Sequence, residues 1–154
     1  MDESAVDFAI VAYRDGGAWE VVEASPGHVL DVEGITAALR RFDSEVGAIA
    51  MISVDEDFFV LARTHGDDVR FVLSDVQAVP ENALAAEVAE EVGHDDDVED
   101  DLVAIGRLDL LADLGFGAGE LEMLCDDTEL YPDEMLGDIA ARLGFGRQFE
   151  ELVG

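Results

Sequence analysis

The sequence predicts an α+β fold, with an antiparallel sheet of five strands followed by a helical C-terminal part. Two observations favour this class. Of five apolar segments in the first half, the first two and the last three are separated by short turn signals, such as DGG at 15–17, and only antiparallel strands accept connections this short. Beyond residue 105 the apolar residues recur instead at helical spacing. The 154 residues are 49% hydrophobic, so the chain is large enough to bury a core.

The first half alternates between strand and helix patterns. The five strands are expected at 6–14, 18–24, 46–54, 58–64 and 69–76. Two helices are expected at about 32–42 and 81–92, the second with Pro80 before it and Gly93 after it. The resulting order, ββαβββα, resembles that of profilin-like, longin and roadblock modules, in which one five-stranded antiparallel sheet lies between helices. Topology of this kind does not by itself specify a function.

The C-terminal part carries helix stop signals. Helices are expected at about 106–114, 118–125, 132–143 and 147–152. The tetrapeptide LGFG occurs twice, at 114–117 and 143–146, where its first glycine suits the left-handed position after a helix and its Phe can fold back. A helix-hairpin-helix that binds phosphate is the alternative. Glu120, Glu122, Glu150 and Glu151 would repel phosphate and only Arg147 would attract it, so the structural interpretation is preferred.

These patterns divide the chain into three parts. Residues 1–92 form the predicted sheet module, 93–105 an acidic linker or loop, and 106–154 a helical part that either packs on the sheet as one domain or stands apart. Phe58 and Phe59 are adjacent in a strand, so their side chains point to opposite faces. One joins the core, and the other meets a partner or, as we prefer, the C-terminal helices.

Charge is the unusual feature of the composition. The chain has 38 acidic and 8 basic residues, all arginine, for a formal net charge of −30. This charge argues against direct binding to a nucleic-acid backbone, which requires clustered Lys or Arg. It leaves open a surface adapted to high salt, a basic protein partner, mimicry of a nucleic acid, or a solvated surface without a specific partner. The acidic start MDESAVDF resembles neither a signal peptide nor a membrane span, so we expect a cytoplasmic protein.

The chain lacks recognisable chemical motifs. It contains no P-loop and no lysine with which to build one, and no H-x-E or P-C-x-x-C as in the zinc deaminases. The acidic run at 95–101 lacks the glycine and the last glutamate of a calcium loop. Potential zinc ligands are scattered singly, at His28, His65, His94 and Cys125. We therefore expect no metal, cofactor or catalytic residue, and a core thiol at Cys125.

Several segments together resemble one family. They are ISVDEDFFVLARTHGDDVRFVLSDV (52–76), LDLLADLG (108–115) and LEMLCDDTELYPDEMLGDIAARLGFGRQFEELV (121–153). In this order they resemble the actinobacterial proteins associated with tRNA adenosine deaminase. The resemblance implies a non-catalytic cytoplasmic companion of the enzyme that converts adenosine to inosine at the tRNA wobble position. It supplies no catalytic residues.

The main functional hypothesis is therefore a binding or regulatory protein whose partner is a tRNA adenosine deaminase or another basic protein. Two alternatives remain: a small-ligand-binding or enzymatic domain with its site between sheet and helices, and an acidic, salt-adapted interaction scaffold. The candidate partner-binding residues are Asp55, Glu56, Asp57, Tyr131, Asp133 and Glu134. For each of them, ordinary turn or cap chemistry is the competing interpretation.

Overall fold

A computed structural model describes residues 6–24, 29, 31–42, 47–54, 58–65, 68–75, 78, 82–93, 104–126 and 130–153. Its strands are β1 (Val6–Asp15), β2 (Ala18–Glu23), β3 (Ile49–Val54), β4 (Phe58–His65), β5 (Asp68–Leu73) and β6 (Ile105–Gly106). Its helices are α1 (Val32–Leu39), α2 (Ala83–Glu91), α3 (Ala118–Cys125), α4 (Pro132–Leu143) and α5 (Gly146–Val153). The predicted α+β class with an antiparallel sheet is confirmed.

The sheet contains six strands in the order β2-β1-β3-β4-β5-β6, so the prediction of five strands is wrong. The sixth strand, β6, pairs with β5 through Val72↔Gly106 and Leu73↔Ile105. A strand of two residues is too short to show alternation, which is why the sequence pattern does not reveal it. Gly106 has φ +110°, and a Cβ there would lie 2.3 Å from the carbonyl oxygen of Phe71. Only glycine permits this approach of the two strands.

The prediction of a helix at about 106–114 is also wrong. After β6 the chain turns and forms only a short 3₁₀ helix, η4 (Ala112–Leu114). The amide of Arg107 donates to the carbonyl of Phe71 at 3.0 Å, and the amide of Leu108 donates to that of Gly106 at 3.1 Å. Pairing with the sheet thus engages the residues that would have begun the helix. The likeness to profilin-like modules stays a prediction.

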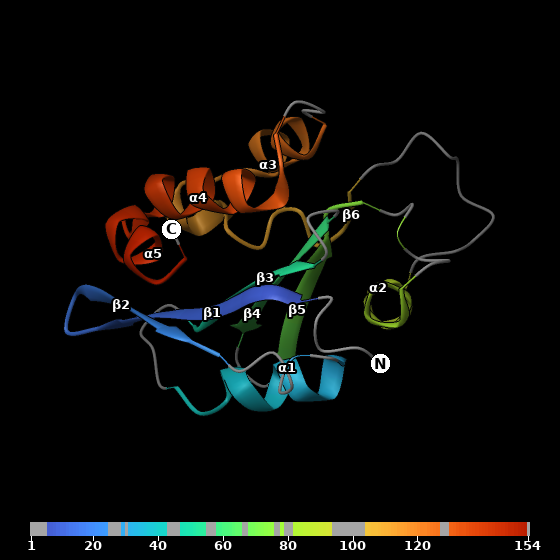
Figure 1. The fold of residues 1–154 in the computed structure, drawn as a ribbon, viewed down its shortest axis with the longest axis horizontal. Helices are drawn as coiled ribbons and strands as arrows, with labels where there is room; N and C mark the ends of the chain where they lie inside the picture. The colour runs from blue at the N-terminus through green and yellow to red at the C-terminus, as the bar shows by residue number, and fades with distance from the viewer. Residues whose placement is uncertain are drawn as a thin grey trace.

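Helices cover both faces of the sheet (Figure 1). Helices α1 and α2 pack on one face, while α3, α4 and α5 form a helical layer on the other. The two-residue period of a strand puts Phe58 on the first face and Phe59 on the second, and both are buried. The C-terminal helices therefore cover Phe59, as predicted. Both faces of the sheet must be covered by helices, because β3 and β4 carry apolar side chains on both faces.

The two LGFG segments end their helical turns as predicted. Gly115 and Gly144 have φ +98° and +108°, the left-handed conformation that glycine adopts without steric cost. The amides of Gly144 and Phe145 both donate to the carbonyl oxygen of Ala140, at 3.0 and 2.9 Å. Phe116 and Phe145 are buried between the helical layer and the sheet. The repeated tetrapeptide is therefore a stop signal joined to a hydrophobic anchor.

One tryptophan joins the sheet to the end of the helical layer. Trp19 in β2 packs against Phe145, with ring centroids 4.9 Å apart, and the Arg14 guanidinium lies 5.2 Å from the centroid of its ring. The Gln148 side-chain amide of α5 donates to the Trp19 carbonyl at 3.2 Å. Among the described residues, the indole N–H of Trp19 has no hydrogen-bond partner. Packing of the Trp19 indole against Phe145 is therefore the main interaction between β2 and the end of the helical layer.

Replacing Gly144 by alanine tests the stop signal. In Gly144→Ala the backbone would have to keep φ +108°. The new Cβ would lie 3.5 Å from the Trp19 indole nitrogen. We expect the free energy of unfolding to fall by about 1–2 kcal/mol because a left-handed backbone is unfavourable for alanine. Urea unfolding followed by Trp19 fluorescence measures the loss. Gly119→Ala is the control, since a Cβ there meets nothing within 4 Å, and its stability should not fall. Equal stabilities of the two variants would contradict this role for Gly144.

Candidate functional site

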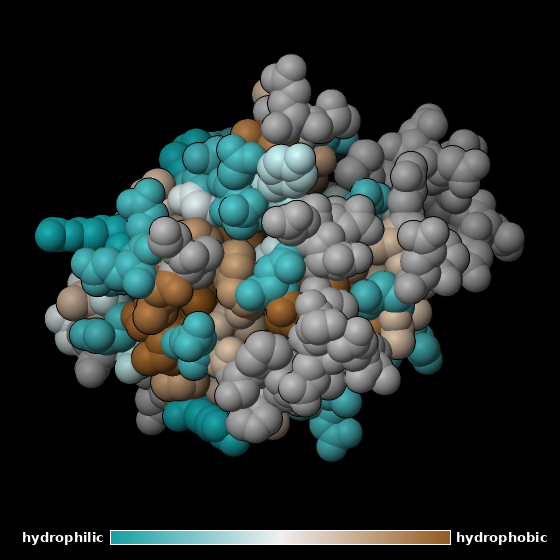
Figure 2. All heavy atoms as spheres, in the orientation of Figure 1, coloured by the Kyte–Doolittle hydropathy of each residue, from teal (hydrophilic) through white to brown (hydrophobic). Residues whose placement is uncertain are grey.

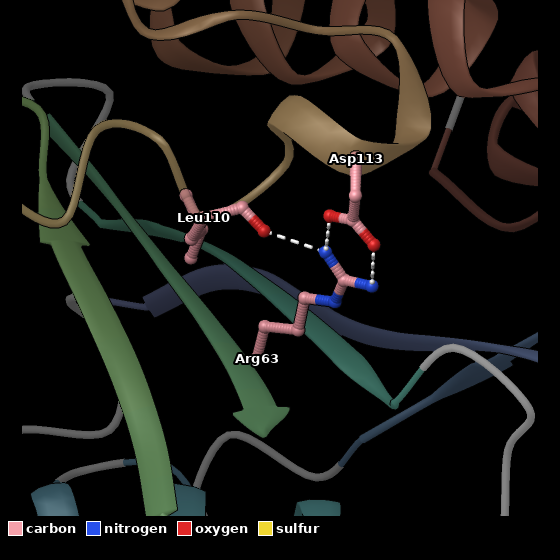
Figure 3. Close-up of polar contacts among 3 residues, drawn as sticks. All are labelled: Arg63, Leu110 and Asp113. Atoms are coloured by element: carbon pink, nitrogen blue, oxygen red, sulfur yellow. Dashed lines mark hydrogen bonds and ion pairs between the residues drawn. The ribbon is translucent and has the colours of Figure 1, made fainter.

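A buried arginine attaches the helical layer to the sheet. Arg63 lies on the face of β4 that this layer covers, and its side chain is only 8% exposed. One terminal nitrogen donates to the Leu110 carbonyl and to Asp113 Oδ1, both at 2.6 Å, and the other donates to Asp113 Oδ2 at 2.9 Å (Figure 3). This fork-to-carboxylate geometry holds the segment that leads from β6 into α3. The role of Arg63 is thus to position the helical layer.

The sequence interpretation above missed Arg63, although the sequence contains a signal for it. Phe59, Leu61 and Arg63 share one strand face, so an arginine that follows two core residues on that face must enter the covered side. A buried guanidinium requires an acceptor. Its partner Asp113 lies 50 residues later in an irregular segment, which no local pattern could identify.

Three predicted partner-binding residues come together at the beginning of α4. Tyr131 precedes the helix and is 60% exposed, while Asp133 and Glu134 are exposed in its first turn. The Glu134 carboxylate accepts a hydrogen bond from the Tyr131 amide at 3.1 Å. Glu134 therefore caps the helix, and that capping role leaves its carboxylate at the surface.

The other three predicted residues, Asp55, Glu56 and Asp57, lie outside the described residues. They connect β3, which ends at Val54, to β4, which begins at Phe58. Their part in binding stays a prediction.

The exposed apolar side chains distinguish the helical layer from the rest of the described surface. Three large ones are exposed there: Met123 at 75%, Tyr131 at 60% and Leu152 at 39%. All three belong to α3, α4 with its preceding residue, or α5, and none lies on α1 or α2. In the view of Figure 2, hydrophilic residues cover the outer helices and hydrophobic residues show at the level of the strands. Single exposed apolar side chains are common on folded proteins, so their exposure alone does not identify an interaction surface.

Carboxylates surround these apolar groups. The two arginines of the layer are both paired: Arg142 with Glu120 of α3, and Arg147 with Glu151 at 3.9 Å. The exposed acidic residues of the layer are Glu120, Glu122, Asp126, Asp133, Glu134, Asp138, Glu150 and Glu151. The described surface of the layer is therefore strongly negative.

A separate groove on the opposite side gathers arginines. It has a volume of about 540 Å³, beside the part of β5 that β6 does not reach, and Arg40, Arg70 and Arg107 line it. Asp68 and Glu91 line the same groove. Arg107 donates to Asp109 at 3.3 Å, and this hydrogen bond is the main reason that the pKa of Asp109 is lowered. Neighbouring carboxylates thus balance the arginine charge.

The described ranges offer few side chains that could bind a metal ion or act as a nucleophile. No group of three or more His, Cys, Asp or Glu side chains lies close enough there to hold a metal ion. Cys125 is buried, and this burial, followed by the charges of Asp126, Asp75 and Glu122, raises the pKa of its thiol to about 12. Such a thiol stays protonated and is a poor nucleophile. No helix in the same ranges is long and apolar enough to cross a membrane.

Comparisons with known proteins give one consistent result. Residues 7–146 match the family model described as Rv3753c-like tRNA adenosine deaminase-associated protein. The chain is also 31% identical over 150 residues to Protein Rv3753c of Mycobacterium tuberculosis, covering 95% of this chain and 87% of that protein. No solved structure matches the chain.

Removing the carboxylate of Asp113 tests the attachment of the helical layer. In Asp113→Ala, Arg63 loses both hydrogen bonds to the Asp113 carboxylate while its own side chain stays buried. We expect the free energy of unfolding to fall by roughly 2–3 kcal/mol, less than for a fully buried pair because Asp113 is 64% exposed. Urea unfolding measures this loss.

Asp109→Ala is the matched control, because it removes an exposed carboxylate paired to Arg107 in the same segment. Its stability should change little. A loss in Asp113→Ala no greater than that in Asp109→Ala would show that the Arg63 fork does not stabilise the layer.

The buried thiol gives a test of reactivity. At pH 8 the Cys125 thiol should be protonated, because its pKa of about 12 lies far above that pH. A thiol-specific disulfide reagent should therefore react slowly with the native protein and quickly after unfolding in urea, with both rates followed by absorbance. Native and unfolded rates that agree would show that Cys125 is accessible.

Proposed function

Because the chain belongs to the Rv3753c-like tRNA adenosine deaminase-associated protein family, we propose that it is a non-catalytic companion that binds a tRNA adenosine deaminase directly. The observation that carries this proposal is the charge of −30, with 38 acidic residues against 8 basic ones. An enzyme that binds tRNA requires a basic surface to contact the phosphates. The acidic chain is complementary to such a surface.

Complementary charge supplies a mechanism. Opposite fields accelerate the encounter of two proteins and make the association sensitive to salt. While bound, the acidic chain covers basic surface that would otherwise contact tRNA, and so acts as an inhibitor of the enzyme or as a chaperone for it. In either role, the protein would work in the cytoplasm together with the deaminase. Neither role requires a catalytic group in this chain, in keeping with the buried and protonated thiol of Cys125.

One observation favours a second function. The groove beside β5, with a volume of about 540 Å³, has the size of a small-molecule site. Its arginines and carboxylates together favour a small polar ligand. Mass spectrometry of the purified chain under native conditions would reveal such a ligand, and a retained small molecule would support this alternative.

The direct test of the companion function is a titration of the chain with the purified deaminase from the same organism. We expect calorimetry to show binding at low salt, with an affinity that falls as salt increases because the charges are screened. Deamination of tRNA should change when the chain is added at low salt. Absence of binding at every salt concentration, with an unchanged rate of deamination, would refute the proposal.

A further inference from the structure

A groove between α3 and α4 on the helical layer is lined mostly by apolar side chains. Its volume is about 450 Å³. Phe116, Leu124 and Ala141 contribute apolar surface, and Met123 stands beside them with 75% of its surface exposed. Leu121 and Cys125 of α3 point inward to the sheet, so helical periodicity directs Met123 outward. The groove therefore joins a buried aromatic ring to an exposed, flexible thioether.

One ion pair spans the groove, and a further carboxylate lies beside it. Arg142 of α4 pairs with Glu120 of α3 across the groove, and its guanidinium lies 5.4 Å from the centroid of the Phe116 ring. Asp138 is exposed on the same border. Two carboxylates, those of Glu120 and Asp138, and one arginine line the groove, so its rim carries a net negative charge. An apolar groove with an acidic rim fits an apolar side chain flanked by basic ones.

The groove is less suited to other occupants. A second copy of this chain would bring another net charge of −30 to the same acidic rim. A small-molecule site needs polar groups that converge inside the cavity. The charged side chains of this groove, those of Glu120, Asp138 and Arg142, are exposed at its border. The chemistry thus favours a segment of a basic protein.

We propose that the α3–α4 groove binds an amphipathic helix of the partner protein, with one apolar side chain seated against Met123 and Leu124 and with Lys or Arg residues facing the rim. This inference rests on the companion function proposed above and identifies the docking surface for it. Methionine suits this role because its unbranched thioether adapts to the shape of the incoming side chain. The apolar contact supplies affinity and the rim supplies orientation.

The test compares two variants of the full chain in calorimetric titrations with the purified deaminase. Met123→Gln keeps the length of the side chain and removes its apolar character, and we expect the Kd to rise about 10-fold or more. Leu152→Gln makes the same kind of change on α5, outside the groove, and should leave the Kd unchanged. Both side chains are exposed, so both variants should fold, and circular dichroism checks this.

Oxidation by hydrogen peroxide provides a second readout. Met123 should be converted to its sulfoxide quickly in the free chain and slowly in the complex. Met51, which is 0% exposed, and Met135, at 8%, are the buried references within the same molecule. If the unmodified chain binds the deaminase while Met123→Gln binds equally well and Met123 oxidises at the same rate in the complex, the groove assignment is wrong and the companion function stands. If the unmodified chain does not bind at all, both proposals fail.

Discussion

The arrangement of the helical layer depends on one ion pair whose arginine is buried. Arg63 points from the sheet into a covered, largely apolar space, where an unpaired guanidinium would be strongly unfavourable. Asp113 and the Leu110 carbonyl satisfy it, and both belong to the irregular segment before α3. The pair consequently determines where this segment crosses the sheet and where α3 begins. Apolar packing alone is non-directional and would allow the layer to slide.

The position of the layer in turn determines which side chains reach water. With Leu121 and Cys125 against the sheet, Met123 must face outward, and with Leu136, Ile139 and Leu143 buried, the acidic side of α4 faces the solvent. The two LGFG stops end η4 and α4, and each buries one phenylalanine. An acidic surface with a few apolar groups is the result. The same packing that completes the core thus creates the surface proposed to bind the partner.

The sequence predicted those features that repeat along the chain. Apolar runs between turn signals revealed the five longer strands, and helical spacing with its glycine stops revealed α3, α4 and α5 within a few residues. Leu108, Leu111 and Leu114 are also spaced as in a helix, but pairing of β6 with β5 prevailed there. Tyr131, Asp133 and Glu134 were predictable as neighbours because they begin one helix. The exposure of Met123 was not predictable. Leu121, Leu124 and Cys125 surround it in sequence, and only tertiary packing decides which of these side chains is covered.

Trp19 has a consequence for the cooperativity of the molecule. It belongs to an edge strand, yet its indole rests on Phe145, and its carbonyl accepts from Gln148 of the last helix. Separation of the helical layer and melting of β2 would therefore expose the same ring. Since the chain contains one tryptophan, its fluorescence responds to both events, and comparison with circular dichroism shows whether the two parts of the molecule unfold in one step or in two.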